Sequence, residues 1–122
     1  MANKTCLITG ANSGIGFETA KALCVKGYKV ILVCRTKEKA NTAISNIKLQ
    51  YPEANMDYAV ADLSSQAEIR SLAKVLAERQ QVIDVLINNA GSWYSDMVLT
   101  DDGIERQWAI NHLAPFLLTH LL

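Results

Sequence analysis

The sequence predicts a doubly wound α/β fold, built on a parallel sheet that this chain leaves incomplete. Short apolar runs alternate with longer segments of helical periodicity over the 122 residues. Two of the runs, residues 30–33 and 85–87, are continuously apolar, which is typical of parallel strands covered by helices on both faces. The alternation and the continuous runs together indicate a βαβαβαβα order.

Each element follows from its local pattern. The apolar runs predict strands at residues 5–9, 29–34, 56–61 and 82–88. The segments between them predict helices at about 14–26, 37–50 and 65–80, with a last helix from about Ile104. Ser65 and Glu68 have the spacing of a capping box at the start of the third helix. On the second and third helices apolar residues recur at i, i+3, i+4 and i+7, at Ala40, Ala43, Ile44 and Ile47 and at Ile69, Leu72, Ala73 and Leu76.

Composition limits the possible functions. Half of the residues are apolar, which is enough to build one domain spanning residues 1–122. Lys and Arg number 12, as do Asp and Glu, so no net charge attracts nucleic acid or an anionic membrane. Cys6, Cys24 and Cys34 each lie in an apolar run, which indicates reduced core thiols in a cytoplasmic protein. No apolar stretch reaches the ~20 residues of a membrane span, and a strand at Thr5 leaves no room for a signal peptide.

Glycines gather between the first strand and the first helix, in the stretch TGANSGIG at residues 9–16. Glycine permits tight or left-handed turns and leaves no Cβ between the backbone and a ligand. The helix that follows offers unpaired N–H groups and the positive end of its dipole, which suits a pyrophosphate. The order of strand, glycine loop and helix therefore predicts dinucleotide binding rather than a purely structural turn.

Four ordered motifs carry a family resemblance. They are the spacing Gly10-x-x-x-Gly14-x-Gly16, ADL at residues 61–63, NNAG at 88–91 and NHLAPFLLTHLL at 111–122. In these motifs the chain resembles the short-chain dehydrogenase/reductase family, and most of all its retinol-dehydrogenase-like members. The resemblance implies a Rossmann-type fold and a nicotinamide dinucleotide cofactor, contacted in the glycine loop by Gly10, Asn12, Ser13, Gly14, Ile15 and Gly16.

The residue after the second strand bears on the choice of cofactor. Dinucleotide sites often carry an acidic residue about 20 positions past the glycines, which binds the ribose 2′-OH of NAD, whereas an arginine accommodates a 2′-phosphate. Arg35 occupies this position, and no acidic residue follows it before Glu38. We therefore expect NADP(H) to be favoured over NAD(H). The alternative is that Arg35 is a surface residue that merely ends the strand.

Further cofactor contacts follow from the resemblance. It implies that Asp62 contacts the adenine amino group and that Leu63 lines the adenine ring. Alternatively, Asp62 caps the turn into the next helix. In the NNAG segment Asn88 is expected to be structural, while the residues on the cofactor side are Asn89, Ala90 and Gly91.

The resemblance also implies a catalytic set of Asn, Ser, Tyr and Lys, of which only the Asn can be located. Asn111 matches the family position whose main-chain carbonyl holds a water in a proton relay. Pro115, four residues later, has no N–H to donate to this carbonyl, which leaves it free; alternatively, the proline is only a tolerated kink. No tyrosine is followed four residues later by a lysine, so the sequence contains no Tyr-x-x-x-Lys.

The expected function of the complete protein is hydride transfer between NADP(H) and a carbonyl or alcohol group of an apolar small molecule. The complete protein is expected to be a homo-oligomer, and the resemblance implies that the last helix could alternatively form the subunit contact. The 122-residue chain alone is expected to be inactive. The alternatives are a catalytically inactive module that senses the dinucleotide and an inactive fragment of the enzyme.

Two aromatic residues and two histidines leave alternatives open. Trp93 and Tyr94 follow NNAG directly, and either wall the nicotinamide or substrate mouth or pack under the loop. His112 and His120 lie eight residues apart without a carboxylate or cysteine at metal-ligand spacing, which favours core or interface positions over metal ligands. No metal site is expected.

Overall fold

The computed structural model describes residues 4–12 and 14–122. Contacts divide the chain into two compact units. The first unit runs as far as Val60 and includes Val82–Asn89, whereas the second consists of Ala61–Gln81 and Ala90–Leu122. Each unit has its own elements and its own packing.

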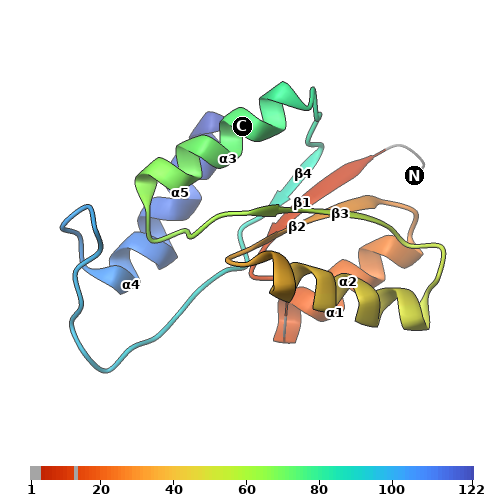
Figure 1. Cartoon of the computed structure of the whole chain (residues 1–122), viewed down its shortest axis with the longest axis horizontal. Coiled ribbons are helices and arrows are strands. Elements are labelled where there is room, and N and C mark those ends of the chain that lie inside the picture. Colours follow the sequence, from red (N-terminus) through yellow and green to blue (C-terminus); the bar gives the residue numbers. More distant parts are fainter. Residues whose placement is uncertain (1–3, 13) are drawn as a thin grey trace. The chain divides into compact units, whose positions relative to one another are not determined.

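The first unit contains a parallel sheet with the strand order β3-β2-β1-β4 (Figure 1). The register pairs Thr9 with Val33, so the carboxyl ends of β1 and β2 lie at the same edge, and β4 pairs with β1 in the same direction. The chain proceeds from β1 outward to β3 and then returns to the other side of β1. The position between β1 and β4 is therefore the topological switch point, where such sheets bind ligands. The strands are β1 (Thr5–Thr9), β2 (Lys29–Cys34), β3 (Asn55–Val60) and β4 (Val85–Ile87).

Two helices, α1 (Gly14–Val25) and α2 (Lys37–Gln50), cover one face of this sheet (Figure 1). Alternate strand residues such as Ile8, Val30 and Leu32 meet the helices, because successive side chains of a strand point to opposite faces. The helices contribute Ala20, Cys24, Ala40, Ala43 and Ile47 to the same core.

The three cysteines are free and buried, as the sequence predicted. Burial raises the pKa of Cys6 to about 11 and also raises the pKa values of Cys24 and Cys34. Because the thiolate is the reactive form, these residues are inert core residues.

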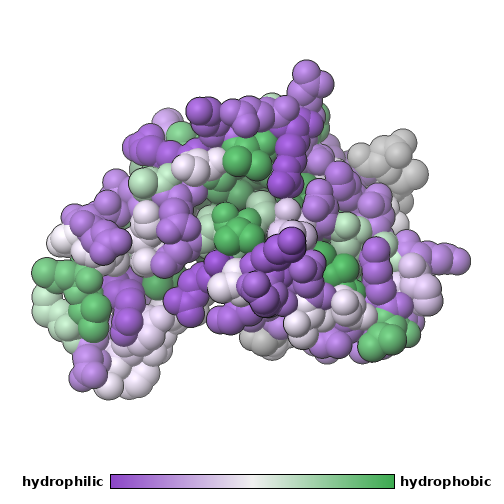
Figure 2. All heavy atoms as spheres, in the orientation of Figure 1, coloured by the Kyte–Doolittle hydropathy of each residue, from purple (hydrophilic) through white to green (hydrophobic). Residues whose placement is uncertain are grey.

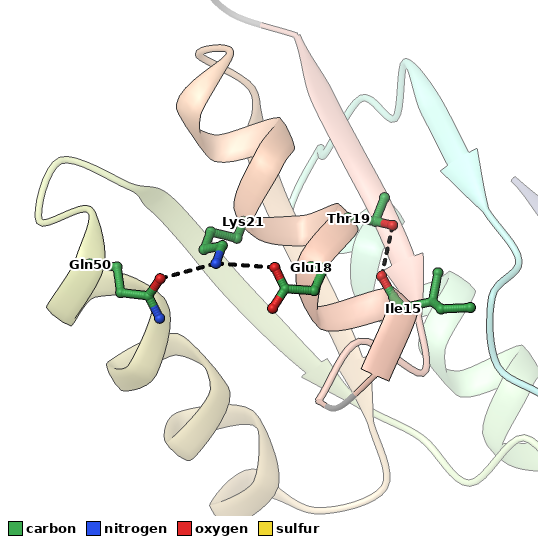
Figure 3. A network of polar contacts seen from close by, with 5 residues as sticks. All are labelled: Ile15, Glu18, Thr19, Lys21 and Gln50. Atoms are coloured by element: carbon green, nitrogen blue, oxygen red, sulfur yellow. Dashed lines mark hydrogen bonds and ion pairs between the residues drawn. The ribbon is translucent and has the colours of Figure 1, made fainter.

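A polar contact joins α1 to α2 (Figure 3). Lys21 Nζ donates to Gln50 Oε1 at 3.0 Å and forms an ion pair with Glu18 at 3.1 Å. The Thr19 hydroxyl donates to the Ile15 carbonyl one turn earlier, at 2.8 Å. An ion pair this exposed contributes at most about 1 kcal/mol. The apolar core, rather than this contact, holds the helices in place.

The second unit is helical. Its elements are α3 (Gln66–Glu78), α4 (Arg106–Trp108), the π-helical turn η1 (Ala109–Leu113) and α5 (Ala114–Leu121). Helices α3 and α5 pack against each other. The buried side of α3 is formed by Ile69, Leu72 and Leu76, as the periodicity predicted. Among the described residues no helix is both long and apolar enough to cross a bilayer.

The last helix differs from its expected form. It begins at Arg106 rather than Ile104, and it widens at η1, where the Ala114 N–H donates to the Ala109 carbonyl five residues earlier. Such π-helical turns are rare and occur frequently at functional sites. Pro115 is the second residue of α5, and it lies inside a continuous helical segment because η1 runs directly into α5. That Pro115 frees the Asn111 carbonyl stays a prediction.

The fourth strand is shorter than expected. The run at residues 82–88 forms a strand only at Val85–Ile87, because only these residues pair with β1. Just before it, the Asp84 carboxylate accepts the Thr5 N–H at 2.8 Å and continues the connection by a side chain. Every other strand and helix before Val82 ends within two residues of its expected position. The α/β fold with a parallel sheet is confirmed.

Candidate functional site: a dinucleotide-binding edge

The three glycines of the loop after β1 have two different roles. Gly10 and Gly14 have φ values of 66° and 62°, in the left-handed region that residues with a Cβ rarely adopt. A Cβ added to Gly14 would meet no described atom within 4 Å beyond its chain neighbours, so the backbone here is bare and open to a ligand. The other predicted loop residues Asn12 and Ile15 are exposed, whereas Ser13 lies outside the described residues.

Gly16 is required for packing instead. A Cβ at this position would collide with the Asn89 side chain and would lie 2.5 Å from the Gly10 carbonyl oxygen. The first turn of α1 therefore sits directly against the loop, and only a glycine fits between them.

Asn89, two residues after the end of the neighbouring strand β4, holds the glycine loop. Its side-chain Nδ2 donates to the Gly10 carbonyl at 3.0 Å, and its backbone N–H donates to the Thr9 hydroxyl at 3.1 Å. These bonds join the two strands that flank the switch point. The sequence assigned the structural role to Asn88, and the structure shows that Asn89 has a bracing role of its own.

Arg35 follows β2 at the same edge of the sheet as the glycine loop. It is exposed, and within residues 4–12 and 14–122 its guanidinium has no hydrogen-bond or ion-pair partner. The next residue, Thr36, caps α2 by accepting the Lys39 N–H at 3.2 Å on its hydroxyl. Arg35 thus precedes a capped helix, and its charged group has no partner within the described residues.

In the second unit, Asp62 organises the turn that leads into α3. Its Oδ1 accepts from the Ser64 N–H at 2.9 Å and from the Ser64 hydroxyl at 2.7 Å. Its backbone N–H donates to Glu68 Oε1 at 2.8 Å. One half of the predicted capping box is present, because Ser65 Oγ accepts the Glu68 N–H at 3.3 Å, but the Glu68 carboxylate binds Asp62 instead of Ser65. In the described part of the chain, Asp62 Oδ2 accepts no hydrogen bond.

Leu63 lies beside this turn and faces the helices of the second unit. With Ile69, Leu113 and Leu117 it lines a mainly apolar cavity of about 150 Å³. Its predicted contact with an adenine ring is a separate matter that stays a prediction.

Asn111 binds the segment that follows NNAG by a reciprocal pair of hydrogen bonds. Its Oδ1 accepts the Ser92 N–H at 2.8 Å, and its Nδ2 donates to the Ser92 carbonyl at 2.7 Å. Gly91 lies next to this pair, because a Cβ there would be 3.5 Å from Asn111 Oδ1. The structure therefore brings together two predicted site residues, Asn111 and Gly91, and adds Ser92, which sequence reasoning missed. Ser92 contributes backbone groups only, so no residue-type signal marks it.

Further contacts hold the loop before α4. The guanidinium carbon of Arg106 lies 3.3 Å from the centre of the Tyr94 ring, and Gln107 Nε2 donates to the Tyr94 carbonyl at 3.0 Å. Glu105 caps α4, and the backbone N–H groups of Gln107 and Trp108 lower the pKa of its carboxyl group.

The aromatic and histidine residues of this unit differ from one another in burial. Trp93 is exposed and does not pack under the loop, whereas Tyr94 is half-buried beneath Arg106. His112 is exposed and stacks on Trp108 with 4.3 Å between ring centres, and His120 is also exposed, so neither is a core residue. The described residues contain no group of three or more potential metal ligands.

These features define the class of protein first. A parallel sheet with a bare glycine turn at its switch point, and with an arginine after the next strand that has no partner among the described residues, is typical of a dinucleotide-binding fold. Comparison with known families then identifies the particular one: residues 4–122 match the family model described as short chain dehydrogenase. The chain belongs to the short-chain dehydrogenase family.

Individual relatives agree with this assignment. The chain is 41% identical to human retinol dehydrogenase 13 over 119 residues, which cover 98% of this chain and 36% of that protein. A metagenomic short-chain oxidoreductase solved in complex with NADP has a TM-score of 0.82 and 29% identity, covering 100% of this chain and 56% of that one. A Sphingobium yanoikuyae short-chain dehydrogenase in complex with NADPH has a TM-score of 0.78 and 32% identity, covering 97% and 46%. This chain thus spans about a third to a half of the length of these relatives.

Proposed function

We propose that the complete protein is an NADP(H)-dependent oxidoreductase that interconverts a carbonyl and an alcohol on an apolar small molecule. Family membership supports the reaction class, and two of the related structures contain NADP or NADPH. The observation that carries the cofactor choice is Arg35, whose charged group has no partner among the described residues. A guanidinium in this position is suited to a 2′-phosphate.

The residues of each unit have separate roles in this proposal. In the first unit, the glycine loop presents bare backbone to the pyrophosphate, Asn89 keeps the loop in place, and Arg35 pairs with the 2′-phosphate. In the second unit, Asp62 Oδ2 accepts from the adenine amino group while Oδ1 holds the turn, so both roles considered for Asp62 coexist. Ala90 and Gly91 pass along the nicotinamide ribose, and the Asn111 carbonyl belongs to the proton relay.

When bound, the nicotinamide supplies the hydride or accepts it. The 122-residue chain has no Tyr-x-x-x-Lys, so we expect it to bind the cofactor without turning over a substrate. A second candidate function is a dinucleotide-sensing module without catalysis. Detection of NADPH-dependent carbonyl reduction by the complete protein would exclude that candidate. A cytoplasmic location and self-association of the complete protein are part of the proposal.

Reversing the charge of Arg35 tests the cofactor choice. Arg35→Asp should weaken NADPH binding by about 2 kcal/mol, or roughly thirtyfold in Kd, because a charge-assisted bond is replaced by repulsion. NADH binding should change little. The measurement is isothermal titration of both cofactors. Lys48→Asp, which makes the same charge change in the last turn of α2, is the matched control.

The outcomes separate the parts of the proposal. An unchanged ratio of NADPH to NADH affinity in Arg35→Asp would remove Arg35 from the site. Absence of binding of either cofactor to the unmutated protein would contradict the dinucleotide site itself.

A further inference from the structure

Glu68, in the first turn of α3, makes a contact that its position in the sequence does not predict. In a capping box, the carboxylate at this position accepts the N–H of the residue that caps the helix, which here is Ser65. The Ser65 N–H donates instead to the Asp62 carbonyl at 3.1 Å. Because this donor is already used, the Glu68 carboxylate reaches further back along the chain and accepts the Asp62 N–H at 2.8 Å.

This contact completes the restraint on Asp62. The Asp62 N–H donates to Glu68, and the Asp62 carbonyl accepts from Ser65. Its Oδ1 accepts from the N–H and the hydroxyl of Ser64, which closes the turn through the side chain. Within residues 4–12 and 14–122, Oδ2 is the one polar atom of Asp62 without a hydrogen bond. The surrounding bonds thus fix Asp62 and leave the oxygen that is proposed to accept from the adenine amino group.

Glu68 lies on the outer side of α3, where charged side chains usually contribute little. Hydrophilic residues cover this side of the helix (Figures 1 and 2), and Glu68, Arg70 and Lys74 are among its exposed residues. The positions three and four residues from Glu68 carry no basic side chain, so the helix offers it no ion pair at the usual spacing. Among the described residues the Glu68 carboxylate therefore has a partner in Asp62 and no competing ion pair.

We propose that Glu68 is a positioning residue for the adenine of the cofactor. By holding the Asp62 N–H, it keeps Asp62 Oδ2 in place for the 6-amino group and favours adenine over a purine that carries an oxygen at this position. This inference rests on the proposed function and adds a residue to its adenine contact. A carboxylate accepts a hydrogen bond from an amino group and repels a carbonyl oxygen. It discriminates well only when it is held in place, because a mobile carboxylate turns away from an unfavourable partner.

Asp102 provides a matched control at the same end of α3. Its Oδ2 accepts the Gln66 N–H at 2.9 Å, so it also holds a backbone N–H at the start of the helix through a carboxylate. In the described structure it makes no bond to Asp62. Asp102→Ala therefore repeats the loss of one carboxylate contact and leaves the bonds of Asp62 intact.

Binding of two cofactors to the complete protein measures the discrimination. NADPH carries adenine, and reduced nicotinamide hypoxanthine dinucleotide phosphate carries the oxygen-substituted purine on an otherwise unchanged molecule. Isothermal titration of the unmutated protein should give about tenfold tighter binding of NADPH, as expected for one hydrogen bond to a charged group. In Glu68→Ala this ratio should fall to about twofold, whereas Glu68→Gln, whose amide oxygen still accepts the Asp62 N–H, and Asp102→Ala should keep it. A Glu68→Ala variant that keeps the full ratio would overturn the inference.

Amide hydrogen exchange tests the bond itself, without a cofactor. In the ¹⁵N-labelled complete protein, the Asp62 amide should exchange about tenfold faster in Glu68→Ala than in the unmutated protein, because it is left open to water. Glu68→Gln should keep this exchange slow. The Gln66 amide should respond to Asp102→Ala and not to Glu68→Ala. Equal exchange of the Asp62 amide in Glu68→Ala and in the unmutated protein would contradict the role of Glu68.

Asp62→Ala separates failure of the inference from failure of the proposed function. If Asp62→Ala loses the preference for adenine and Glu68→Ala keeps it, the role of Glu68 is wrong and the proposed adenine contact stands. If Asp62→Ala keeps the preference, or the unmutated protein has none, the adenine contact is wrong and the inference fails with it. If neither cofactor binds to the unmutated protein, the dinucleotide site is contradicted, and the inference with it.

Discussion

The loop after β1 and the loop after β4 both carry proposed cofactor residues, and they are held in different ways. The first, at residues 10–13, is short, and its restraint is concentrated at one point, where Gly10, Gly16 and Asn89 meet. The second, at residues 90–105, is long, and several side-chain contacts share its restraint. We therefore expect one added methyl group to disrupt the conformation of the first loop. In the second loop, removal of any one contact should cost only a small part of the stability.

Gly16→Ala tests the concentrated restraint and should have the largest effect. The added methyl group meets the Asn89 side chain and the Gly10 carbonyl, so either the loop or α1 must move. We expect the free energy of unfolding in urea to fall by about 3 kcal/mol and cofactor binding to be lost.

Gly14→Ala is the matched control for this substitution. Its Cβ meets open space, and only the positive φ opposes it, so the free energy of unfolding should fall by about 1 kcal/mol. If the two variants were equally stable, close packing at Gly16 would not explain the loss of stability in Gly16→Ala.

Asn111→Ala tests the distributed restraint of the second loop. It removes both bonds to Ser92 but keeps the main-chain carbonyl of Asn111, and we expect a loss of about 1 kcal/mol because the pair is exposed. Urea denaturation measures this loss. A fall in kcat of the complete protein, under conditions where the variant is still folded, would show that the bonds to Ser92 also position the relay.

Ser92→Ala is the control, because both bonds use the Ser92 backbone and its buried hydroxyl has no partner in the described structure. This variant should be as stable as the unmutated protein or slightly more so. A large loss in Ser92→Ala would contradict the assignment of the tie to the backbone.

Removal of the cap in Glu105→Ala should have the smallest effect on stability, and the size of this effect should depend on pH. The Gln107 and Trp108 N–H groups lower the pKa of Glu105 in the folded state, so its carboxylate favours folding when ionised. This contribution is fully present above the ordinary pKa of a glutamate and is lost as the pH falls through the lowered folded value. Thermal unfolding of Glu105→Ala should differ from that of the unmutated protein at neutral pH, and the difference should shrink in acid. A difference independent of pH would assign the effect to packing.

Much of the fold could be predicted because its signals are local. The second strand and second helix begin and end where the apolar run and the helical periodicity do, at residues 29–34 and 37–50. The length of β4 could not be predicted from the sequence, because it depends on pairing with β1, which is distant along the chain. The π-helical turn at Ala109–Leu113 was missed for a similar reason, since no residue pattern distinguishes it from an ordinary helix.

In the candidate site too, local features could be predicted and long-range contacts could not. The glycine spacing, Arg35 and Asn111 were visible as residue types in a meaningful order. The partners that hold them were not: Asn89 binds Gly10 across 79 positions of sequence, and Asn111 binds the backbone of Ser92, whose side chain has no part in the bond. A hydrogen bond to a main-chain group leaves no mark on the partner's identity.

The sequence by itself determined which elements form, that the strands are parallel, and which loop residues lack a Cβ or carry a charge suited to a phosphate. These properties depend on periodicity and on intrinsic conformational freedom, which belong to each short segment. Only the tertiary structure decided which glycine is needed for its φ and which for close packing, and that Asn89 holds the glycine loop. Those properties depend on atoms that the fold brings together from distant parts of the chain.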